Sequence, residues 1–331
     1  MLRRRVLFLF LLLLTIAAAG AEPRPQAIFP GQAEPEISAG ILHAYDHALR
    51  REYPEAKSIC AELGRRFPQS PAGPVGEMVL YQVTMIENDD YQYDIEFREA
   101  ARRSATAAEI FAKLAPKNDW YYTLLGAAWG IEGIYYLRQD EYLEGVLRGL
   151  KGLNHMQQAA KRNPENWEAQ LGIGLYLYYR SAYSAFIPLP GLDQRRQGIT
   201  MVAEAGRRRP YLHEVSRIAL YYIYLNESDH DRARSYMDAL IAERPDFPIF
   251  YLLAGRAMLA KPDYRAAAAY FESIRRLDPG LYISYFRLGE CALHSGRKDE
   301  ARSWFQRFER MPGARRSRFY GQAESYLSDL R

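Results

Sequence analysis

Apolar residues recur with the period of an α-helix along the C-terminal third of the chain, and the pattern is repeated. The stretch "AYFESIRRLDPG", from Ala269 to Gly280, has the form of a helix followed by a stop, and "SWFQRFERMPG", from Ser303 to Gly313, has the same form 34 residues later. Apolar residues three and four apart share one side of a helix, and proline cannot continue one. The pattern therefore predicts a repeated helical unit.

Three further kinds of position match at the same offset. They are a glycine, a small residue and a bulky aromatic residue: Gly255 and Gly289, Ala267 and Ala301, and Phe271 and Phe305. Small residues let two helices approach closely, and bulky ones fill the space between them. One helix pair cannot bury its apolar face alone, so the repeat predicts a stack of pairs.

These units resemble tetratricopeptide repeats. That pattern has an aromatic residue and Leu-Gly in the first helix, then Ala, a bulky residue, Ala and Pro in the second. Leu125 and Gly126 in "YYTLLGAAW" occupy the Leu-Gly place of an earlier unit, and Pro164 closes it. The resemblance implies an all-α fold, a right-handed superhelical solenoid of about six or seven antiparallel helix pairs.

Two units in the middle of the chain are longer than the family pattern. In the family pattern, the small residue of the second helix follows the glycine of the first helix by about 12 residues. In this chain, Gly126 and Gly152 are 26 residues apart, and Gly174 and Gly198 are 24 apart. Longer helices or an extended turn would account for the extra residues in each unit. The second surplus contains a proline-rich insertion near residues 180–193, which favours a loop, and a capping helix near residues 315–331 covers the last apolar face.

Glycines also recur inside the predicted helices of these units. They stand at Gly126, Gly130 and Gly133, and then at Gly145, Gly149 and Gly152. Because they follow the helical pattern, they predict close helix packing rather than a phosphate-binding loop.

The N-terminus predicts export. A basic start at residues 3–5 and an apolar run from Val6 lead to Ala19-Gly20-Ala21, which predicts a signal peptide over residues 1–21. The run is shorter than the ~20 residues of a membrane-spanning helix, so the protein is expected to be exported, periplasmic or secreted. Membrane contact is expected only through an uncleaved N-terminal segment. Residues 22–37, with four prolines, predict a flexible arm before a repeat domain over residues 38–331.

Composition narrows the class of partner. The chain has 331 residues, of which 48% are hydrophobic and 25% charged, as in ordinary globular proteins. The formal charge is +4, but Arg3, Arg4 and Arg5 lie in the predicted signal, so the rest is nearly neutral. Nucleic acid is not an expected partner, because it requires a basic surface. Cys60 and Cys291 are expected to be separate buried thiols, although an oxidising compartment also permits a disulfide.

Candidate catalytic and metal-binding chemistry is sparse. His43 and His47 share one helical face and could hold a metal, or they are surface or packing residues; no third ligand lies nearby. Asp89, Asp90 and Asp94 surround a turn and are expected to start a helix and face solvent, with a catalytic pair as the alternative. No catalytic residue, metal or cofactor is predicted.

The resemblance also assigns a partner-binding face. In this family the first helices line the concave side, and the matching places are Tyr178, Tyr179, Tyr222, Asn226, Arg256, Glu290 and His294. Aromatic and polar side chains together suit an extended peptide. The alternative for the tyrosines is packing, because the repeat itself requires aromatic residues. The apolar stretch "AFIPLPG", residues 185–191, is a second possible contact, either exposed or folded over a groove.

The function implied by the resemblance is a non-catalytic scaffold or adaptor that holds a peptide or partner protein in a concave groove, outside the cytoplasm. Two other classes stay open. An enzyme or small-ligand-binding protein that uses the array as a frame would need a closed pocket with converging ionisable groups. A structural oligomerisation module would make its contacts along an edge or end of the array.

Overall fold

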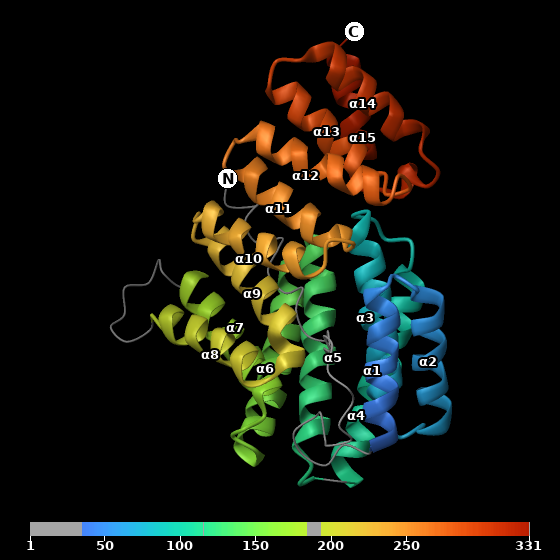
Figure 1. Cartoon of the computed structure of the whole chain (residues 1–331). Coiled ribbons are helices and arrows are strands. Elements are labelled where there is room, and N and C mark those ends of the chain that lie inside the picture. The colour runs from blue at the N-terminus through green and yellow to red at the C-terminus, as the bar shows by residue number, and fades with distance from the viewer. Residues whose placement is uncertain (1–34, 115, 184–192, 331) are drawn as a thin grey trace. The chain divides into compact units, whose positions relative to one another are not determined.

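The computed structural model describes residues 35–114, 116–183 and 193–330. These residues are helical almost throughout and contain no β-strand (Figure 1). The predicted signal peptide, residues 22–34 of the predicted arm and residues 184–192 of the predicted insertion lie outside the described residues. The helices are α1 (Pro35–Leu49), α2 (Tyr53–Arg66), α3 (Ala72–Glu87), α4 (Asp94–Leu114), α5 (Asp119–Arg138), α6 (Tyr142–Arg162), α7 (Trp167–Tyr183), α8 (Arg195–Arg208), the 3₁₀ turn η3 (Pro210–Leu212), α9 (His213–Asn226), α10 (His230–Glu243), α11 (Pro248–Ala260), α12 (Tyr264–Leu277), α13 (Ile283–His294), α14 (Lys298–Arg310), the 3₁₀ turn η4 (Ala314–Arg316) and α15 (Tyr320–Asp329).

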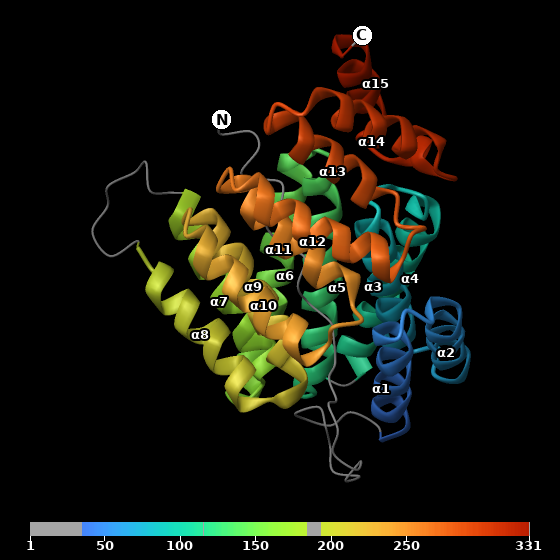
Figure 2. The same cartoon turned by 45° about the horizontal axis from the view of Figure 1, so that its top comes forward.

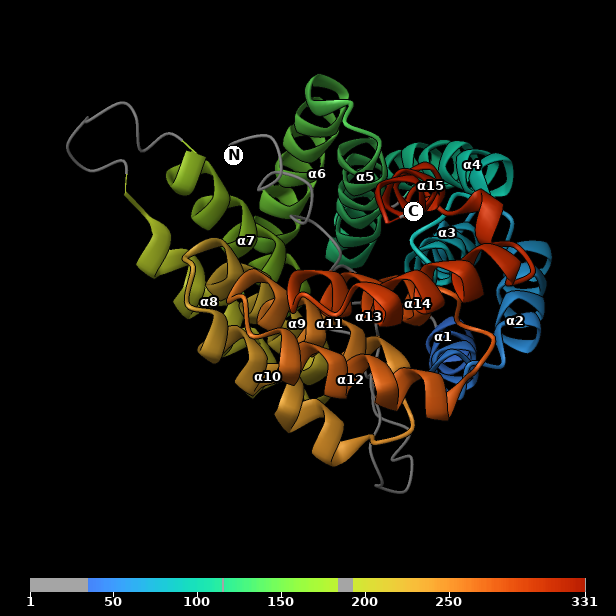
Figure 3. The same ribbon diagram turned by 90° about the horizontal axis from the view of Figure 1, so that it is seen from above.

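The chain divides into two compact units. Unit 1 comprises Met1–Gln82 and Ile95–Ile223, and unit 2 comprises Val83–Asp94 and Tyr224–Arg331. In unit 1, α1 packs on α2, α5 on α6 and α7 on α8, as Figures 1 and 3 show. In unit 2, each helix from α10 to α14 packs on the next, and α15 packs on α14 (Figure 2). Each unit is thus built from helices that pack on their neighbours in sequence.

The glycine and phenylalanine that recur at an offset of 34 face each other. A Cβ atom on Gly255 would lie 2.5 Å from Cε1 of Phe271, and one on Gly289 would lie 2.5 Å from Cε1 of Phe305. Both rings are fully buried. Glycine is therefore required where the aromatic ring of the second helix packs against the first helix.

A repeated hydrogen bond joins the start of three first helices, α7, α11 and α13, to the proline that closes the unit before. The bond spans six residues, and glutamine takes the place of tyrosine in one unit. The three cases are Tyr251 Oη to the Pro245 carbonyl at 2.9 Å, Tyr285 Oη to the Pro279 carbonyl at 3.2 Å, and Gln170 Nε2 to the Pro164 carbonyl at 3.1 Å.

The first long unit consists of longer helices. Helix α5 has 20 residues and α6 has 21, and only residues 139–141 separate them. A Cβ on Gly133 would lie 2.9 Å from the Gly145 carbonyl oxygen, and one on Gly152 would lie 2.8 Å from the Gly126 carbonyl oxygen. The later glycine of α5 thus meets the earlier glycine of α6, and the earlier one of α5 meets the later one of α6, so the two helices are antiparallel. The glycines serve close packing, as predicted.

Three boundaries differ from the sequence prediction. Helix α1 begins at Pro35, so the last three residues of the predicted arm are helical, which proline permits in a first turn. Helix α7 continues to Tyr183, into the predicted insertion. The predicted capping segment contains α15, which begins only at Tyr320, after the η4 turn.

Asp89 and Asp90 are buried, which corrects the expectation that they face solvent. Asp90 is 0% exposed and accepts a hydrogen bond from the Tyr282 hydroxyl. Asp89 Oδ1 lies 3.1 Å from Arg318 Nε, and its Oδ2 lies 3.9 Å from Arg287 Nη2. All five residues belong to unit 2. Each carboxylate has a charged or hydrogen-bonding partner, as buried acids require.

Both cysteines are buried free thiols, as predicted. Burial raises the pKa of each to about 12. Neither thiol is therefore ionised near neutral pH, and both behave as small apolar core residues.

Candidate functional site

Three of the predicted partner-binding residues lie in the interior of unit 1. Tyr178 is 0% exposed, and Tyr179 and Tyr222 are also buried. The Tyr178 hydroxyl donates a hydrogen bond to the Ile223 carbonyl at 3.1 Å. A buried ring offers no surface to a partner, so the packing role left open for these tyrosines is the one that fits the structure.

The other four predicted residues belong to unit 2. Asn226 and Arg256 are half-buried, and His294 is exposed and stacked on the ring of Tyr264 at a centroid distance of 5.1 Å. Glu290 accepts a bond of 2.6 Å from Arg287, so its charge is already engaged.

Helix α6 carries an apolar stripe that sequence reasoning missed. The stripe consists of Leu143, Val146, Leu147 and Leu150, which are 74%, 54%, 45% and 42% exposed. These four are half of the large hydrophobic residues that stand exposed in the described part of the chain. Their spacing of three, one and three residues places them on one side of the helix. A contiguous exposed apolar face on a helix is typical of a contact surface.

The packing of α5 against α6 explains why the stripe faces outward. Gly145 and Gly152 are buried, and a Cβ on either would lie about 3 Å from a carbonyl oxygen of α5. The glycine face of α6 is therefore committed to α5, and the leucines occupy the opposite side. The regular glycine spacing was the sequence feature that could have located the stripe.

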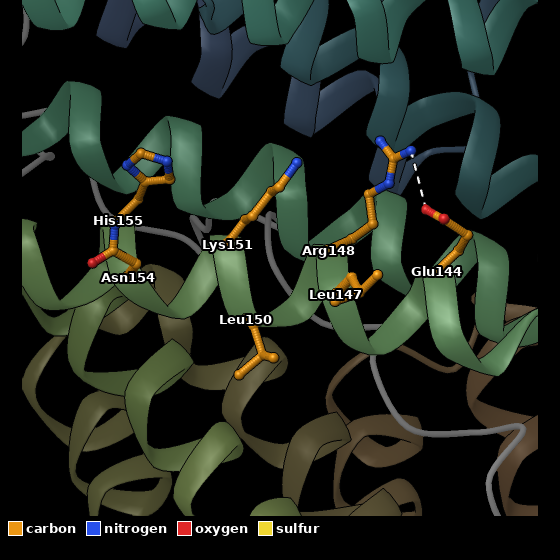
Figure 4. Close-up of a pocket in the computed structure, with 7 residues that line it drawn as sticks. All are labelled: Glu144, Leu147, Arg148, Leu150, Lys151, Asn154 and His155. Carbon is orange, nitrogen blue, oxygen red and sulfur yellow. Dashed lines mark hydrogen bonds and ion pairs between the residues drawn. The ribbon is translucent and has the colours of Figure 1, made fainter.

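A surface pocket of ≈490 Å³ adjoins the stripe. All of its lining residues come from α6: Glu144, Leu147, Arg148, Leu150, Lys151, Asn154 and His155. Figure 4 shows Arg148, Lys151 and His155 along one edge of the helix and Leu150 on the opposite edge. The pocket thus has an apolar wall and a charged wall.

The charged wall is held in place by contacts to α5. Arg148 Nη1 donates to Glu132 Oε1 at 2.6 Å, and its Nη2 lies 3.4 Å from Glu144. The Lys151 ammonium lies 4.5 Å from the ring centroid of Trp129. Burial raises the pKa of Glu132 despite the opposing effect of Arg148. The wall therefore combines a fixed ion pair with a cation that rests on an aromatic ring.

His155, at the end of the same wall, is half-buried. Burial lowers its pKa, with an opposing effect from the charge of Glu109. The imidazole is therefore neutral near pH 7 and adds no positive charge to the wall.

The histidine pair predicted as a possible metal ligand is engaged with protein groups. His47 Nδ1 lies 2.6 Å from Glu52 Oε2, and its Nε2 lies 3.1 Å from Nε2 of His43. Over the described ranges, no three His, Cys, Asp or Glu side chains are grouped as metal ligands. None of the helices described is long and apolar enough to cross a membrane.

The comparisons with known proteins show the fold of the chain and a repeat family that matches part of it. Among solved structures, the chain is similar to the human IFIT1 dimer with m7Gppp-AAAA, at 13% identity and a TM-score of 0.51, over 90% of this chain and 76% of that one. This likeness shows the fold alone, an all-α solenoid of antiparallel helix pairs, and confirms the predicted fold class. The family model described as "Tetratricopeptide repeat" matches residues 219–282 and 263–316. Residues 219–316 of the chain therefore match tetratricopeptide repeats, as the sequence indicated.

Other structures are similar at lower scores. A tetratricopeptide repeat protein from Parabacteroides merdae is 15% identical, with a TM-score of 0.45, over 90% of this chain and 99% of that one. The type IV pilus biogenesis factor PilW is 16% identical, with a TM-score of 0.48, over 69% of this chain and 93% of that one. The chain matches none of the curated proteins.

Proposed function

We propose that the protein is a non-catalytic scaffold or adaptor that binds a protein partner through the exposed face of α6, outside the cytoplasm. The observation that carries this proposal is the apolar stripe of Leu143, Val146, Leu147 and Leu150 beside a pocket with a charged wall. Tetratricopeptide repeats suit a scaffold, because stacked helix pairs present extended, rigid surfaces.

The chemistry of the α6 face favours protein over other partners. An apolar centre with a polar rim is the usual anatomy of a protein interface. A helix that lies on a membrane carries mainly Lys and Arg around its apolar face, whereas Glu144 stands here beside Arg148 and Lys151. The nearly neutral charge outside the predicted signal argues against nucleic acid.

Peptide binding at the predicted concave face is a separate proposal, and it concerns only the four predicted residues of unit 2. Asn226, Arg256, Glu290 and His294 keep some exposed surface, and a peptide bound there would be held by polar side chains.

The test of the α6 face is site-specific cross-linking in the native cell. A photoreactive residue in place of Leu147 is expected to form covalent adducts with protein. The control is Leu277, a leucine of comparable exposure (42%) on α12, which is expected to form few adducts. If Leu147 yields no protein adduct, or no more than Leu277, the assignment of this face fails.

Export is proposed from the Ala19-Gly20-Ala21 pattern. We expect the mature chain to begin at Glu22 and to be recovered outside the cytoplasm. N-terminal peptide mass spectrometry on fractionated cells measures both. A cytoplasmic chain that retains residues 1–21 would contradict the proposal.

A further inference from the structure

The stripe on α6 is complementary to itself when a second copy runs antiparallel. Its spacing of three, one and three residues reads the same from either end of the helix. If the two-fold axis passes between Val146 and Leu147, then Leu143 lies opposite Leu150 of the other copy, and Val146 lies opposite Leu147. Every apolar side chain of the stripe then meets an apolar side chain.

The same arrangement brings opposite charges together. Glu144, Arg148 and Lys151 lie along one edge of α6, and in a two-fold antiparallel pair that edge runs beside its own copy. Glu144 of one copy then falls between Arg148 and Lys151 of the other, within about 3 Å of each along the helix axis. Glu144 is half-exposed, and Lys151 makes no ion pair within the described residues, so both can take part.

We propose that two copies of this chain associate through α6 as an antiparallel, two-fold dimer. This inference rests on the proposed function, because it names a second copy as the partner of the same face. An unrelated partner helix would require an apolar stripe, but it would require neither a stripe that is symmetric on reversal nor charges that pair with themselves. Both properties are present, and together they favour self-association.

The size of the stripe limits the strength of the dimer. Stable protein interfaces bury about 1,200–2,000 Å² in total, and four side chains on each copy bury much less. The dimer is therefore expected to be reversible and to dissociate on dilution. The long α5–α6 hairpin, with its glycine contacts, presents the stripe on a rigid support, which lowers the ordering cost of association.

The first test is sedimentation velocity on the purified chain over a concentration series. The unmodified protein is expected to shift from monomer to dimer. Leu147→Glu places a charge at the two-fold axis and should weaken association at least about tenfold, while Leu277→Glu should leave it unchanged. A chain that stays monomeric throughout, or a dimer that Leu147→Glu leaves intact, overturns the inference.

Charge reversal tests the orientation without disturbing the apolar stripe. Glu144→Lys and Lys151→Glu should each weaken self-association several-fold. Per dimer, Glu144→Lys creates four like-charge contacts, with Arg148 and Lys151 of the other copy, and Lys151→Glu creates two, with Glu144. An equimolar mixture of the two variants should regain dimers, because three of the four contacts that position 144 makes with positions 148 and 151 in the mixed pair join opposite charges. Misfolding of either variant would not be repaired by mixing. Failure of the mixture to regain dimers overturns the antiparallel arrangement.

Engineered cysteines provide a direct geometric check. Leu147→Cys lies next to the axis and should form an intermolecular disulfide alone. Leu143→Cys should not, but Leu143→Cys mixed with Leu150→Cys should. The native thiols Cys60 and Cys291 are buried and should not interfere. If self-association is absent while Leu147 still cross-links to another protein in cells, the proposed function stands and this inference alone fails.

Discussion

Glu168, in the first turn of α7, shows how burial changes the chemistry of a single residue. Its Oε1 accepts a hydrogen bond of 2.5 Å from the Tyr211 hydroxyl, and its Oε2 is buried with no hydrogen-bond partner among the described residues. Burial raises its pKa to about 7; Tyr211 and Arg209 oppose the shift and Asp119 adds to it. The folded protein therefore binds a proton here that the unfolded chain, with an ordinary carboxyl, releases near pH 4.5.

This linkage predicts a pH-dependent stability. Because the folded state holds the proton more tightly, the free energy of unfolding should fall as pH rises from about 4.5 to 7, by about 3 kcal/mol from this group. Glu168→Gln stays neutral and should remove that fall, leaving the variant more stable than the unmodified protein at pH 8. Chemical denaturation from pH 5 to pH 8 measures both. The exposed neighbour Glu165→Gln is the control, and equal pH profiles for the two variants would refute the role of Glu168.

At the scale of the element, the α5–α6 hairpin divides α6 into two faces. Its glycines approach α5 closely, which leaves Leu143 and Leu150 on the side away from α5. The glycine period in the sequence predicts close packing, and the structure confirms it. The glycine period alone does not show that the leucines are exposed, because apolar residues in a repeat protein usually belong to the core. The extra length of the first long unit lies in its helices and not in an extended turn, because only three residues separate α5 from α6.

Close packing predicts that a single methyl group at Gly152 is damaging. Its Cβ would lie 2.8 Å from the Gly126 carbonyl oxygen and 3.1 Å from the Gly130 nitrogen, and backbone atoms cannot move aside cheaply. Gly152→Ala should cost about 1–3 kcal/mol of unfolding free energy. Gly321→Ala, in α15, meets nothing within 4 Å and should be neutral or slightly stabilising. Denaturant titration compares them, and a Gly152→Ala variant as stable as Gly321→Ala would contradict close packing.

At the scale of the whole molecule, unit 2 contains a segment from far away in the sequence. Residues 83–94 belong to it together with residues 224–331, and Asp90 and Tyr282 are 192 positions apart. The guanidinium groups of Arg287 and Arg318 lie 4.3 and 4.8 Å from the ring centroid of Phe319, which holds both cations beside the acidic segment. The repeats of unit 2 are thus completed by a segment that is not itself a repeat.

Removing this contact should destabilise unit 2. Asp90→Ala leaves the Tyr282 hydroxyl without its acceptor in a buried position, at a cost of about 1–3 kcal/mol. Hydrogen exchange of backbone amides should accelerate in α13 and around residues 314–317. Asp299→Ala, whose side chain is 94% exposed in an ion pair with Arg302, is the control and should change exchange little. Unaltered exchange in the Asp90→Ala variant would show that the contact contributes no stability.

The sequence by itself determined the local structure. Gly255 and Phe271, and Gly289 and Phe305, revealed the helix pairs and their packing, because residues of one hairpin are near in sequence and their spacing follows the helical period. Only the tertiary structure decided that Tyr178, Tyr179 and Tyr222 are buried, that Asp89 and Asp90 find partners in unit 2, and that the leucines of α6 stay exposed. These properties depend on which segments from distant parts of the sequence pack together. The helical period cannot predict them, because it reports only on contacts within one helix pair.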